Sequence, residues 1–209
     1  TEINSMGSKD KLKEYKKKRD FDKTVEPSGG NLSKKRKNIF VIQKHDASNL
    51  HYDFRIEIDG VLKSWSVPKG PSTDKNEKRL ALLTEDHPLD YADFEGVIPE
   101  DEYGGGTVIV WDYGKYENLR KDKEDVSMAD SFNEGKIEIN LKGKKLKGGY
   151  VLINTGGDDD NKWLLKKMDD EEADARRNPV SSEPESALSG KKIEEIEKVM
   201  KNDSSKKKK

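Results

Sequence analysis

Two of the three histidines in the chain lie close together, on either side of a short polar segment. His45 precedes residues 46–49, which have the composition of a turn, and His51 follows them. Asp53 lies two residues beyond His51, so a strand would place both side chains on one face. If the flanking segments pair as a hairpin, His45 and His51 become cross-strand neighbours. Two imidazoles and a carboxylate are common ligands of divalent transition metals, so we expect a metal site at His45, His51 and Asp53.

The strand that must position these side chains is indicated by the alternation of residues 50–58. Its apolar face holds Leu50, Tyr52, Phe54, Ile56 and Ile58, and its polar face holds His51, Asp53, Arg55 and Glu57. The first face is typical of a core, and the second presents an imidazole, a carboxylate and a guanidinium together. The alternative is that each histidine is a partly exposed strand residue and that Arg55 and Glu57 form a surface ion pair.

Five further residues are candidates for the same site. Arg55 shares the strand face of Asp53, and Lys69 lies in a rigid corner between two prolines. Arg79 opens a strand that ends near His87, the third histidine, and Tyr91 follows four residues later. A metal beside fixed cations suits a phosphoryl group, because both stabilise negative charge that develops in the transition state. The alternatives are that Lys69 and Arg79 are surface charges and that Tyr91 is a packing tyrosine.

Many short strands separated by glycine-rich turns predict a mainly β protein. The predicted strands are 39–45, 50–58, 61–67, 79–85, 106–111, 114–117, 136–141, 148–154 and 162–167. This pattern favours a compact antiparallel β-barrel over a sandwich, since a polar row facing inward would give the barrel a polar lumen. One short helix is expected near residues 127–134, and residues 94–106 form a lid or a loop that shapes the substrate site.

Composition limits the remaining possibilities. The 209 residues are 40% charged and 31% hydrophobic, so part of the chain lies outside a packed core. The sequence has no apolar run long enough to span a membrane, and it has no cysteine, which excludes thiolate ligands and agrees with a cytoplasmic location. The net charge is −1, but lysine-rich islands at 9–19, 34–37 and 206–209 could steer a polyanion, or could be solvated tails.

We expect three regions along the chain. Residues 1–14 are predicted to be a disordered leader, and residues 15–168 a barrel domain with an N-terminal arm. Residues 169–209 are predicted to be a polar linker or tail, in which 190–201 form a short amphipathic helix because apolar residues recur there at helical spacing.

Two other functions fit parts of the pattern. His51-x-Asp53 followed by His87 resembles the metal-binding triad of non-haem iron oxygenases, although the interval to His87 is short and His45 would be surplus. A nucleic-acid-binding barrel without catalytic activity, in which the histidines are structural, is the second alternative.

Ordered motifs through much of the chain resemble one known family. They are Arg19-Asp20-Phe21-x-x-Thr24-x-Glu26-Pro27, Phe40-Val41-Ile42-Gln43-Lys44-His45, Leu50-His51-Tyr52-Asp53-Phe54-Arg55, Trp65-x-Val67-Pro68-Lys69-Gly70-Pro71, His87-Pro88-x-x-Tyr91, Phe94-Glu95-Gly96-x-Ile98-Pro99 and Tyr103-Gly104-x-Gly106. From about Tyr15 to Met168 the chain is similar to the phosphoesterase domain of bacterial ligase D, an end-joining DNA repair protein, and to its stand-alone relatives.

The resemblance implies a compact β-barrel and a manganese-dependent enzyme, with Co2+ or Zn2+ as other metals. Family members remove a 3′-terminal ribonucleoside to leave a 3′-phosphate, and then hydrolyse that phosphate to a 3′-OH. By this resemblance His45, His51 and Asp53 bind the metal. Arg55 and His87 contact the scissile phosphate, His87 as transition-state stabiliser or proton donor. The other implied residues are Tyr91, Lys69 and Arg79, which line the site, and Arg19, Asp20 and Glu26, which belong to an arm that supports the ribonuclease step.

The resemblance also implies partners. The substrates are the 3′ ends of DNA or of RNA–DNA primer-templates, and the protein partners are a DNA ligase, a polymerase or a Ku-type end-joining protein. We expect a monomer. Residues 186–196 resemble the linker that joins modules in ligase D, so an excised domain and a stand-alone enzyme are both compatible with the sequence.

Overall fold

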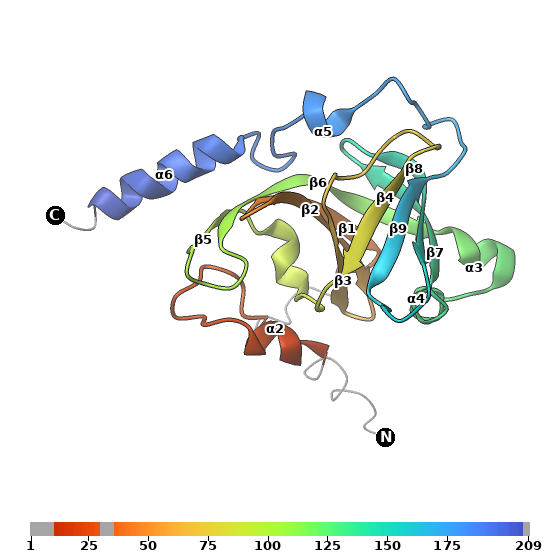
Figure 1. The fold of residues 1–209 in the computed structure, drawn as a ribbon, viewed down its shortest axis with the longest axis horizontal. Helices are drawn as coiled ribbons and strands as arrows, with labels where there is room; N and C mark the ends of the chain where they lie inside the picture. Colours follow the sequence, from red (N-terminus) through yellow and green to blue (C-terminus); the bar gives the residue numbers. More distant parts are fainter. Residues whose placement is uncertain (1–10, 30–35, 207–209) are drawn as a thin grey trace.

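The computed structural model describes residues 11–29 and 36–206, with side chains as far as residue 202 (Figure 1). The described strands are β1 (Ile39–Asp46), β2 (Leu50–Ile58), β3 (Val61–Val67), β4 (Lys78–Leu83), β5 (Gly96–Ile98), β6 (Gly106–Asn118), β7 (Lys136–Gly143), β8 (Lys147–Asn154) and β9 (Lys162–Lys167). The described helices are α2 (Lys13–Lys17), η1 (Leu89–Asp93), α3 (Leu119–Glu124), α4 (Met128–Asn133), α5 (Pro179–Ser182) and α6 (Ile193–Lys206). None of these helices is both long enough and apolar enough to cross a membrane.

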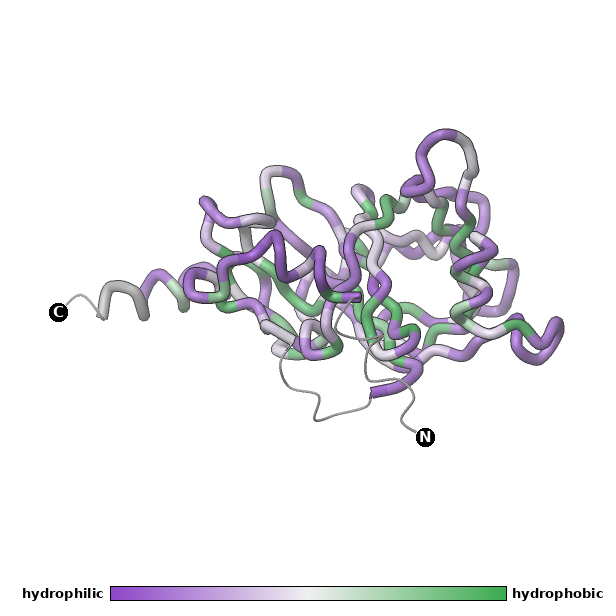
Figure 2. The backbone as a smooth tube through the Cα atoms, turned by 90° about the horizontal axis from the view of Figure 1, so that it is seen from below, coloured by the Kyte–Doolittle hydropathy of each residue, from purple (hydrophilic) through white to green (hydrophobic). Residues whose placement is uncertain are grey.

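The sheet closes on itself as an eight-stranded antiparallel barrel, which confirms the predicted fold class. Its order is β1-β2-β3-β4-β9-β8-β7-β6, and β6 pairs in turn with β1. Viewed from below, the strands surround the interior as a ring (Figure 2). The short strand β5 pairs with the N-terminal part of β6 and lies outside this ring. Strand β1 is therefore hydrogen-bonded on both edges, to β2 and to β6.

The interior of the barrel is filled by apolar side chains. All eight strands of the ring contribute to one buried cluster, whose largest members are Trp65, Trp111 and Trp163. The prediction of a polar lumen is therefore corrected. On β2, Phe54 and its neighbours of the same parity point into the barrel, so Asp53 and Arg55 point outward because strand side chains alternate.

A second apolar cluster covers part of the outer face. It contains Tyr15, Ile39, Val41, Leu62, Tyr91, Ala92, Phe94, Ile98, Val108 and Val110. These residues come from α2, η1, β5 and the outward faces of β1, β3 and β6. The polar row of β2 is therefore enclosed between the barrel wall and the elements packed against it.

Some predicted boundaries differ from the observed elements. The strands predicted at 106–111 and 114–117 are one strand, β6, which runs through Tyr113 and Gly114 without a turn. A Cβ on Gly114 would lie 2.1 Å from the carbonyl oxygen of Lys142, so glycine permits close approach of β7 here. Strand β5 lies within the segment predicted as a lid or loop. The short helix predicted near 127–134 is present as α4.

The N-terminal arm and the segment before α6 both lie on the barrel. Residues 11–14 were expected to belong to the leader, but Leu12 is buried and α2 begins at Lys13; residues 1–10 lie outside the described residues. The segment 169–192, expected to be a linker, passes along the barrel (Figure 1). There the indole Nε1 of Trp111 donates a 2.7 Å hydrogen bond to the carbonyl of Glu183. Beyond it, α6 contacts β5 and β6.

Candidate functional site

The β1–β2 hairpin brings the two neighbouring histidines together. Their backbones are paired residues in the register, and their ring centroids are 4.7 Å apart. His45 Nδ1 lies 3.5 Å from Asp53 Oδ2, and His51 Nε2 lies 3.4 Å from Asp53 Oδ1. One ligand atom from each of the three residues lies within 4.8 Å of the others. This group could therefore hold one metal ion.

The protonation of these groups fits a metal site. His51 Nδ1 lies 2.9 Å from the carbonyl oxygen of Asn49, which only accepts hydrogen bonds, so Nδ1 carries a proton and the neutral ring offers its lone pair at Nε2. His45 Nε2 is buried and has no hydrogen-bond partner among the described residues. Burial alone would raise the pKa of Asp53, but Arg55 and the two histidines hold it well below its ordinary range. The chemistry of this donor set suits a divalent transition metal.

Arg55 is fixed by three groups around it. Its Nη2 donates to Asp53 Oδ2 at 3.1 Å and its Nε donates to Gln43 Oε1 at 2.7 Å. The guanidinium also lies over the ring of Tyr91, 4.9 Å from the ring centroid. Gln43 in turn donates to the carbonyls of Tyr91 at 2.8 Å and Phe94 at 3.1 Å. Arg55 is thus a preoriented cation beside the metal group.

His87 reaches the site from the segment between β4 and η1. An isolated bridge pairs it with Leu62 of β3, and its Nδ1 lies 2.9 Å from the carbonyl of Glu85. Its Nε2 lies 3.4 Å from Arg19 Nη2 and must accept that contact, because a guanidinium only donates. Burial and the nearby charges of Arg55 and Arg19 lower the pKa of His87 well below its ordinary value, so the ring is neutral at pH 7.

The N-terminal arm completes the outer wall of the site. Arg19 Nε donates to Glu26 Oε1 at 3.1 Å, and its Nη1 donates to Glu85 Oε1 at 3.2 Å. The Tyr91 hydroxyl donates to the same oxygen of Glu26 at 2.8 Å, while Thr24 Oγ1 donates to Glu26 Oε2 at 2.9 Å. The arm is therefore joined to the barrel wall by a buried network of charged and polar groups.

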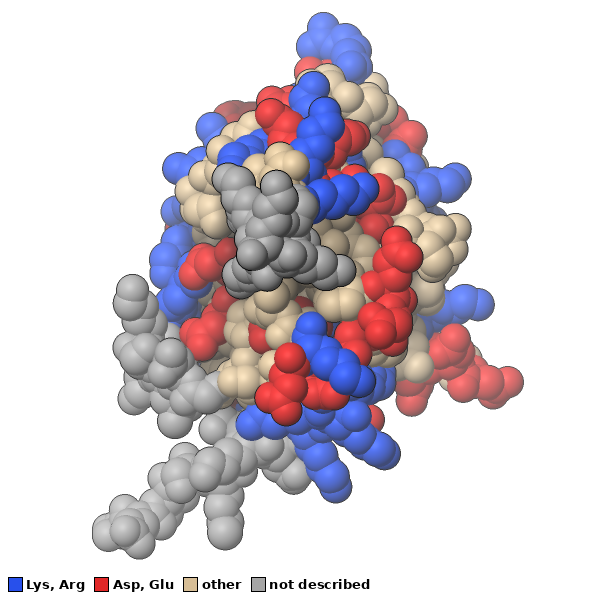
Figure 3. Space-filling model, turned by 90° about the vertical axis from the view of Figure 1, so that its left-hand side faces the viewer, with Lys and Arg blue, Asp and Glu red and all other residues tan. Residues whose placement is uncertain are grey.

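These groups surround one cavity of about 290 Å3. Its lining consists of Arg19, Glu26, His45, Ala47, His51, Asp53, Arg55, Ser66, Thr84, Glu85, His87, Tyr91, Ile98, Tyr103 and Gly104. The metal group, two arginines and a neutral histidine thus share a single water-accessible space. On the face shown in Figure 3, acidic and basic side chains are interspersed rather than segregated.

Comparison with known proteins identifies the family. The model of the DNA ligase D 3′-phosphoesterase domain matches residues 43–154. The chain belongs to this family. It is 47% identical over 189 residues to the multifunctional non-homologous end joining protein LigD of Pseudomonas aeruginosa, covering 88% of this chain and 22% of that protein.

Two mycobacterial relatives agree with this assignment to the phosphoesterase family. The LigD proteins of Mycobacterium tuberculosis (strain H37Rv) and Mycolicibacterium smegmatis are 43% and 44% identical, over 166 and 164 residues. These matches cover 76% and 78% of this chain, but 20% and 21% of the relatives. The chain therefore spans about a fifth of the length of the curated relatives it matches.

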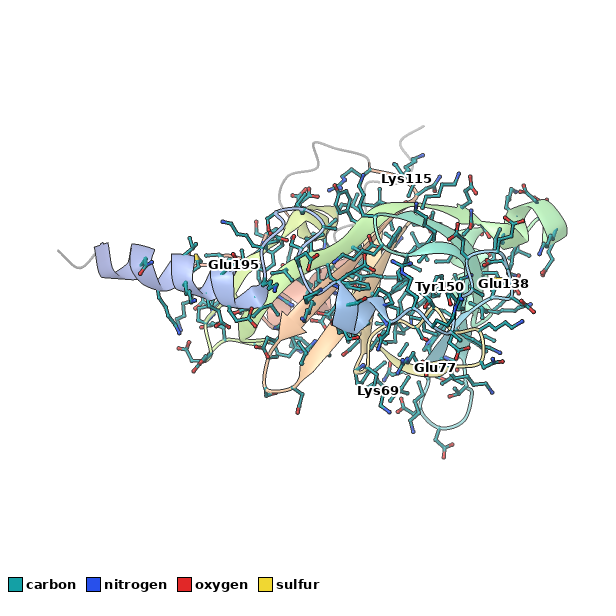
Figure 4. All side chains as sticks on the ribbon, turned by 90° about the horizontal axis from the view of Figure 1, so that it is seen from above. Lys69, Glu77, Lys115, Glu138, Tyr150 and Glu195 are labelled. Carbon is teal, nitrogen blue, oxygen red and sulfur yellow. The ribbon has the colours of Figure 1, made fainter. Side chains whose placement is uncertain are left out.

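The cavity gathers most of the predicted site residues, but three of them do not line it. Lys69 is exposed in the corner after β3 and projects from the edge of the molecule (Figure 4). Arg79 makes a 2.6 Å ion pair with Glu77. Asp20 is exposed on the arm, 3.5 Å from Lys23. Lys69 lies in a corner, Arg79 at the start of a strand and Asp20 at a turn. At such positions the order of residues in the sequence does not determine whether a side chain points toward the cavity.

Sequence reasoning also missed residues of this candidate site. Gln43 supports Arg55, and Glu85 pairs with Arg19. Gln43 has the signal of a polar residue that follows four apolar ones in a predicted strand, two positions before His45. Glu85 had no comparable signal, because it lies in an acidic stretch that is typical of a solvated surface.

Proposed function

We propose that the chain is a metal-dependent 3′-phosphoesterase that prepares DNA 3′ ends for joining in the cytoplasm. It removes a 3′-terminal ribonucleoside to leave a 3′-phosphate, and then hydrolyses that ester with water to give a 3′-OH and inorganic phosphate. The observation that carries the proposal is that the His45–His51–Asp53 group shares one cavity with Arg19, Arg55 and His87. The family membership supports the same activity.

His45, His51 and Asp53 would hold the metal, with manganese proposed as the ion in use and Co2+ or Zn2+ as alternatives. When bound, the ion supplies Lewis-acid stabilisation of a phosphoryl oxygen and lowers the pKa of a coordinated water. An imidazole binds a metal through a lone pair, so the ion would compete with protons for the ligand nitrogens of His45 and His51. A carboxylate that is already ionised adds to the affinity for the cation.

Arg55 would bind the scissile phosphate, since its guanidinium is already oriented by Gln43 and Asp53. His87 is neutral in the free protein and presents a lone pair at Nε2 toward Arg19. A phosphate dianion beside this ring would favour its protonated form, so His87 can gain a proton on substrate binding and donate it to an ester oxygen. Tyr91 would hold both Arg55 and the arm in place.

The arm residues Arg19 and Glu26 would support the ribonuclease step, in which the substrate carries an extra nucleoside beyond the phosphate. Asp20, Lys69 and Arg79 do not line the cavity, so their proposed contribution is to the parts of the nucleic acid outside it. The cations Lys69 and Arg79 would contact the phosphate backbone without reading the sequence, whereas Asp20 would act through its neighbour Lys23.

The two alternative functions fit the cavity less well. An iron oxygenase triad of His51, Asp53 and His87 would need these three side chains to converge, but the group of described residues that converges contains His45 instead. An oxygenase also gives no role to two arginines beside the metal group. A binding barrel without catalysis would explain the arginines, but not a buried His45 Nε2 without a partner among the described residues.

The name of the relatives points to the proposed partners. The curated relatives are called multifunctional end-joining proteins, and this chain matches about a fifth of each. We propose that the domain acts as a monomer on ends that a DNA ligase, a polymerase and a Ku-type protein also handle. This holds whether those activities lie on the same polypeptide or on separate ones.

Product analysis of a 5′-labelled primer-template with one 3′-terminal ribonucleotide tests the proposal. With manganese, the protein should shorten the primer first to a 3′-phosphate and then to a 3′-OH, and His51→Ala should do neither. Lys162→Ala, at an exposed β9 position outside the cavity lining, is the matched control and should act as the parent does. An unchanged primer, together with an unchanged oligonucleotide that carries a plain 3′-phosphate, would exclude the proposed activity.

A further inference from the structure

Tyr103 is an exposed aromatic residue at the mouth of the cavity. It follows β5 in the loop that leads to β6, and its side chain lines the cavity while the residue is 48% exposed. Tyr91, the other tyrosine of the lining, is 3% exposed and is held by Glu26. A Cβ on Gly104, the next residue, would lie 3.8 Å from His45 Cε1. The backbone beside Tyr103 is therefore close to the metal group.

The loop holds this ring in a defined place. The backbone N–H of Glu102 donates to the carbonyl of Pro99, and the N–H of Gly105 donates to the carbonyl of Glu102, both at 3.0 Å. A Cβ on Gly105 would lie 2.6 Å from the same Pro99 carbonyl, so the two ends of the loop are in close contact. The ring is also near two cations of the arm, Lys18 and Arg19, at 5.0 and 5.3 Å from its centroid.

The mechanism proposed above gives Tyr103 no role, because its ring neither belongs to the metal group nor contacts Arg55 or His87 in any described interaction. An exposed aromatic ring beside a phosphate-binding cavity is well suited to stack on a nucleobase, since every base has an apolar face. The cations of the arm, Lys18 and Arg19, add to this, because they would attract the phosphates next to a base stacked on Tyr103.

We propose that Tyr103 is the stacking platform for the base of the nucleotide that carries the scissile phosphate. This inference rests on the proposed 3′-phosphoesterase function and names the part of the substrate that the cavity recognises beyond the phosphate. Stacking tolerates any base, so Tyr103 provides affinity for a nucleoside end without sequence preference. A free phosphate or a small phosphomonoester lacks this contact.

The test compares two oligonucleotides that differ only at the last nucleotide. One ends in a normal 3′-phosphorylated deoxynucleotide, and the other ends in a 3′-phosphorylated abasic residue. Tyr103→Ala should raise KM for the normal end about 10- to 100-fold, with kcat little changed, and should leave KM for the abasic end unaltered. Tyr103→Trp should retain the parent KM, whereas Tyr103→Leu, which keeps an apolar side chain without a ring face, should behave as the alanine variant.

Ile153→Ala is the matched control, because Ile153 is a 43% exposed apolar residue on β8 outside the cavity lining. It should leave both substrates unaffected. Equal effects of Tyr103→Ala on the normal and abasic ends would overturn the inference, since Tyr103 would then only hold the arm. Parent-like KM values in the alanine or leucine variant would overturn it as well.

A binding measurement separates this inference from the proposed catalytic function. A 3′-phosphorylated oligonucleotide with 2-aminopurine as its last base should lose fluorescence on binding to the parent protein, and Tyr103→Ala should abolish that loss. If the parent quenches the base but hydrolyses neither end, the stacking stands and the catalytic proposal fails. Hydrolysis without a Tyr103-dependent change in fluorescence would exclude stacking while the catalytic proposal stands.

Discussion

The hydroxyl of Tyr91 donates a 2.8 Å hydrogen bond to Glu26, which joins the wall of the cavity to an arm 65 residues earlier in the chain. The same Glu26 oxygen accepts a hydrogen bond from Arg19, whose guanidinium faces His87. One carboxylate therefore positions a phenol, a guanidinium and, through it, an imidazole. The arm is part of the site and not an appendage to it.

Loss of a metal ligand should abolish activity without unfolding the barrel. Asp53→Asn keeps the shape of the side chain but removes the negative charge, so manganese affinity should fall by more than about 100-fold, beyond the effect of outer groups that only orient ligands. Titration of the protein with Mn2+, followed by electron paramagnetic resonance, measures this directly. A chelator should reproduce the loss of activity in the parent, and added Mn2+ should restore it. An Asp53→Asn protein that binds Mn2+ as the parent does would contradict the assigned site.

Breaking the arm network should cost stability and should affect the two reaction steps unequally. The side chains of Arg19 and Glu26 are 5% and 1% exposed, and removing one partner of a buried ion pair costs about 3–5 kcal/mol. Glu26→Ala should lower the free energy of unfolding by this amount in urea denaturation. Lys121→Ala, which breaks a fully exposed pair with Asp125, should have little effect.

In the same Glu26→Ala protein, removal of a terminal ribonucleoside should fall more than hydrolysis of a 3′-phosphate. The arm lies over the outer side of the cavity, where the extra nucleoside would bind. Parallel loss of both steps, in proportion to the folded fraction, would mean that the arm only stabilises the barrel.

Gln43 should act through Arg55. Gln43→Leu keeps a similar volume but leaves the Nε of Arg55 and the carbonyls of Tyr91 and Phe94 without their partner, at a cost of roughly 1–3 kcal/mol for unsatisfied buried groups. We expect a higher KM for 3′-phosphorylated ends because Arg55 is no longer oriented. Steady-state kinetics on folded protein measures this, and an unchanged KM would show that Asp53 and Tyr91 suffice to hold the guanidinium.

The neutral state of His87 should make stability depend on pH. Its pKa in the folded protein is well below the ordinary value of 6.5, mainly through burial and then through Arg55 and Arg19. The unfolded chain therefore binds more protons at this position, so its contribution to stability is complete above pH 6.5 and is lost as the pH falls below it.

Urea denaturation of metal-free protein at pH 7.5 and pH 5.5 should show this loss, and His87→Gln should lose less stability over the same interval. His51 shifts in the opposite direction, since its hydrogen bond and attraction to Asp53 outweigh burial and raise its pKa, so the difference between parent and His87→Gln is the relevant quantity. Identical pH dependence in both proteins would contradict a neutral, buried His87.

The sequence predicts the hairpin and its metal group well because both depend on local order. The alternation of 50–58 and the turn at 46–49 place His45 opposite His51 whatever the rest of the chain does. The same alternation does not tell which face of the strand is inside a barrel. Both faces of β2 are largely buried, one in the barrel interior and one against η1 and the arm. Alternation alone therefore predicts the polar row but not that it lies outside the barrel.

The contacts between distant segments could not be predicted in this way. Glu26 lies in a loop of the arm and Tyr91 in a 3-10 helix. The sequence predicts the local structure of such segments but not which distant residues they contact. Similarly, Lys145 is buried because its Nζ donates to the carbonyls of Glu183 and Glu185, in a segment whose composition resembles a linker. Charged residues of this kind are exposed by default, and only the folded chain shows which of them are enclosed.

All three members of the metal group come from a single stretch, residues 45–53, on the two arms of one hairpin. The remaining strands contribute no ligand to this group and serve as the frame that keeps the hairpin rigid. The position of the three ligands therefore depends on the pairing register of this one hairpin, whereas Arg19 and His87 reach the same cavity from the arm and from the segment between β4 and η1.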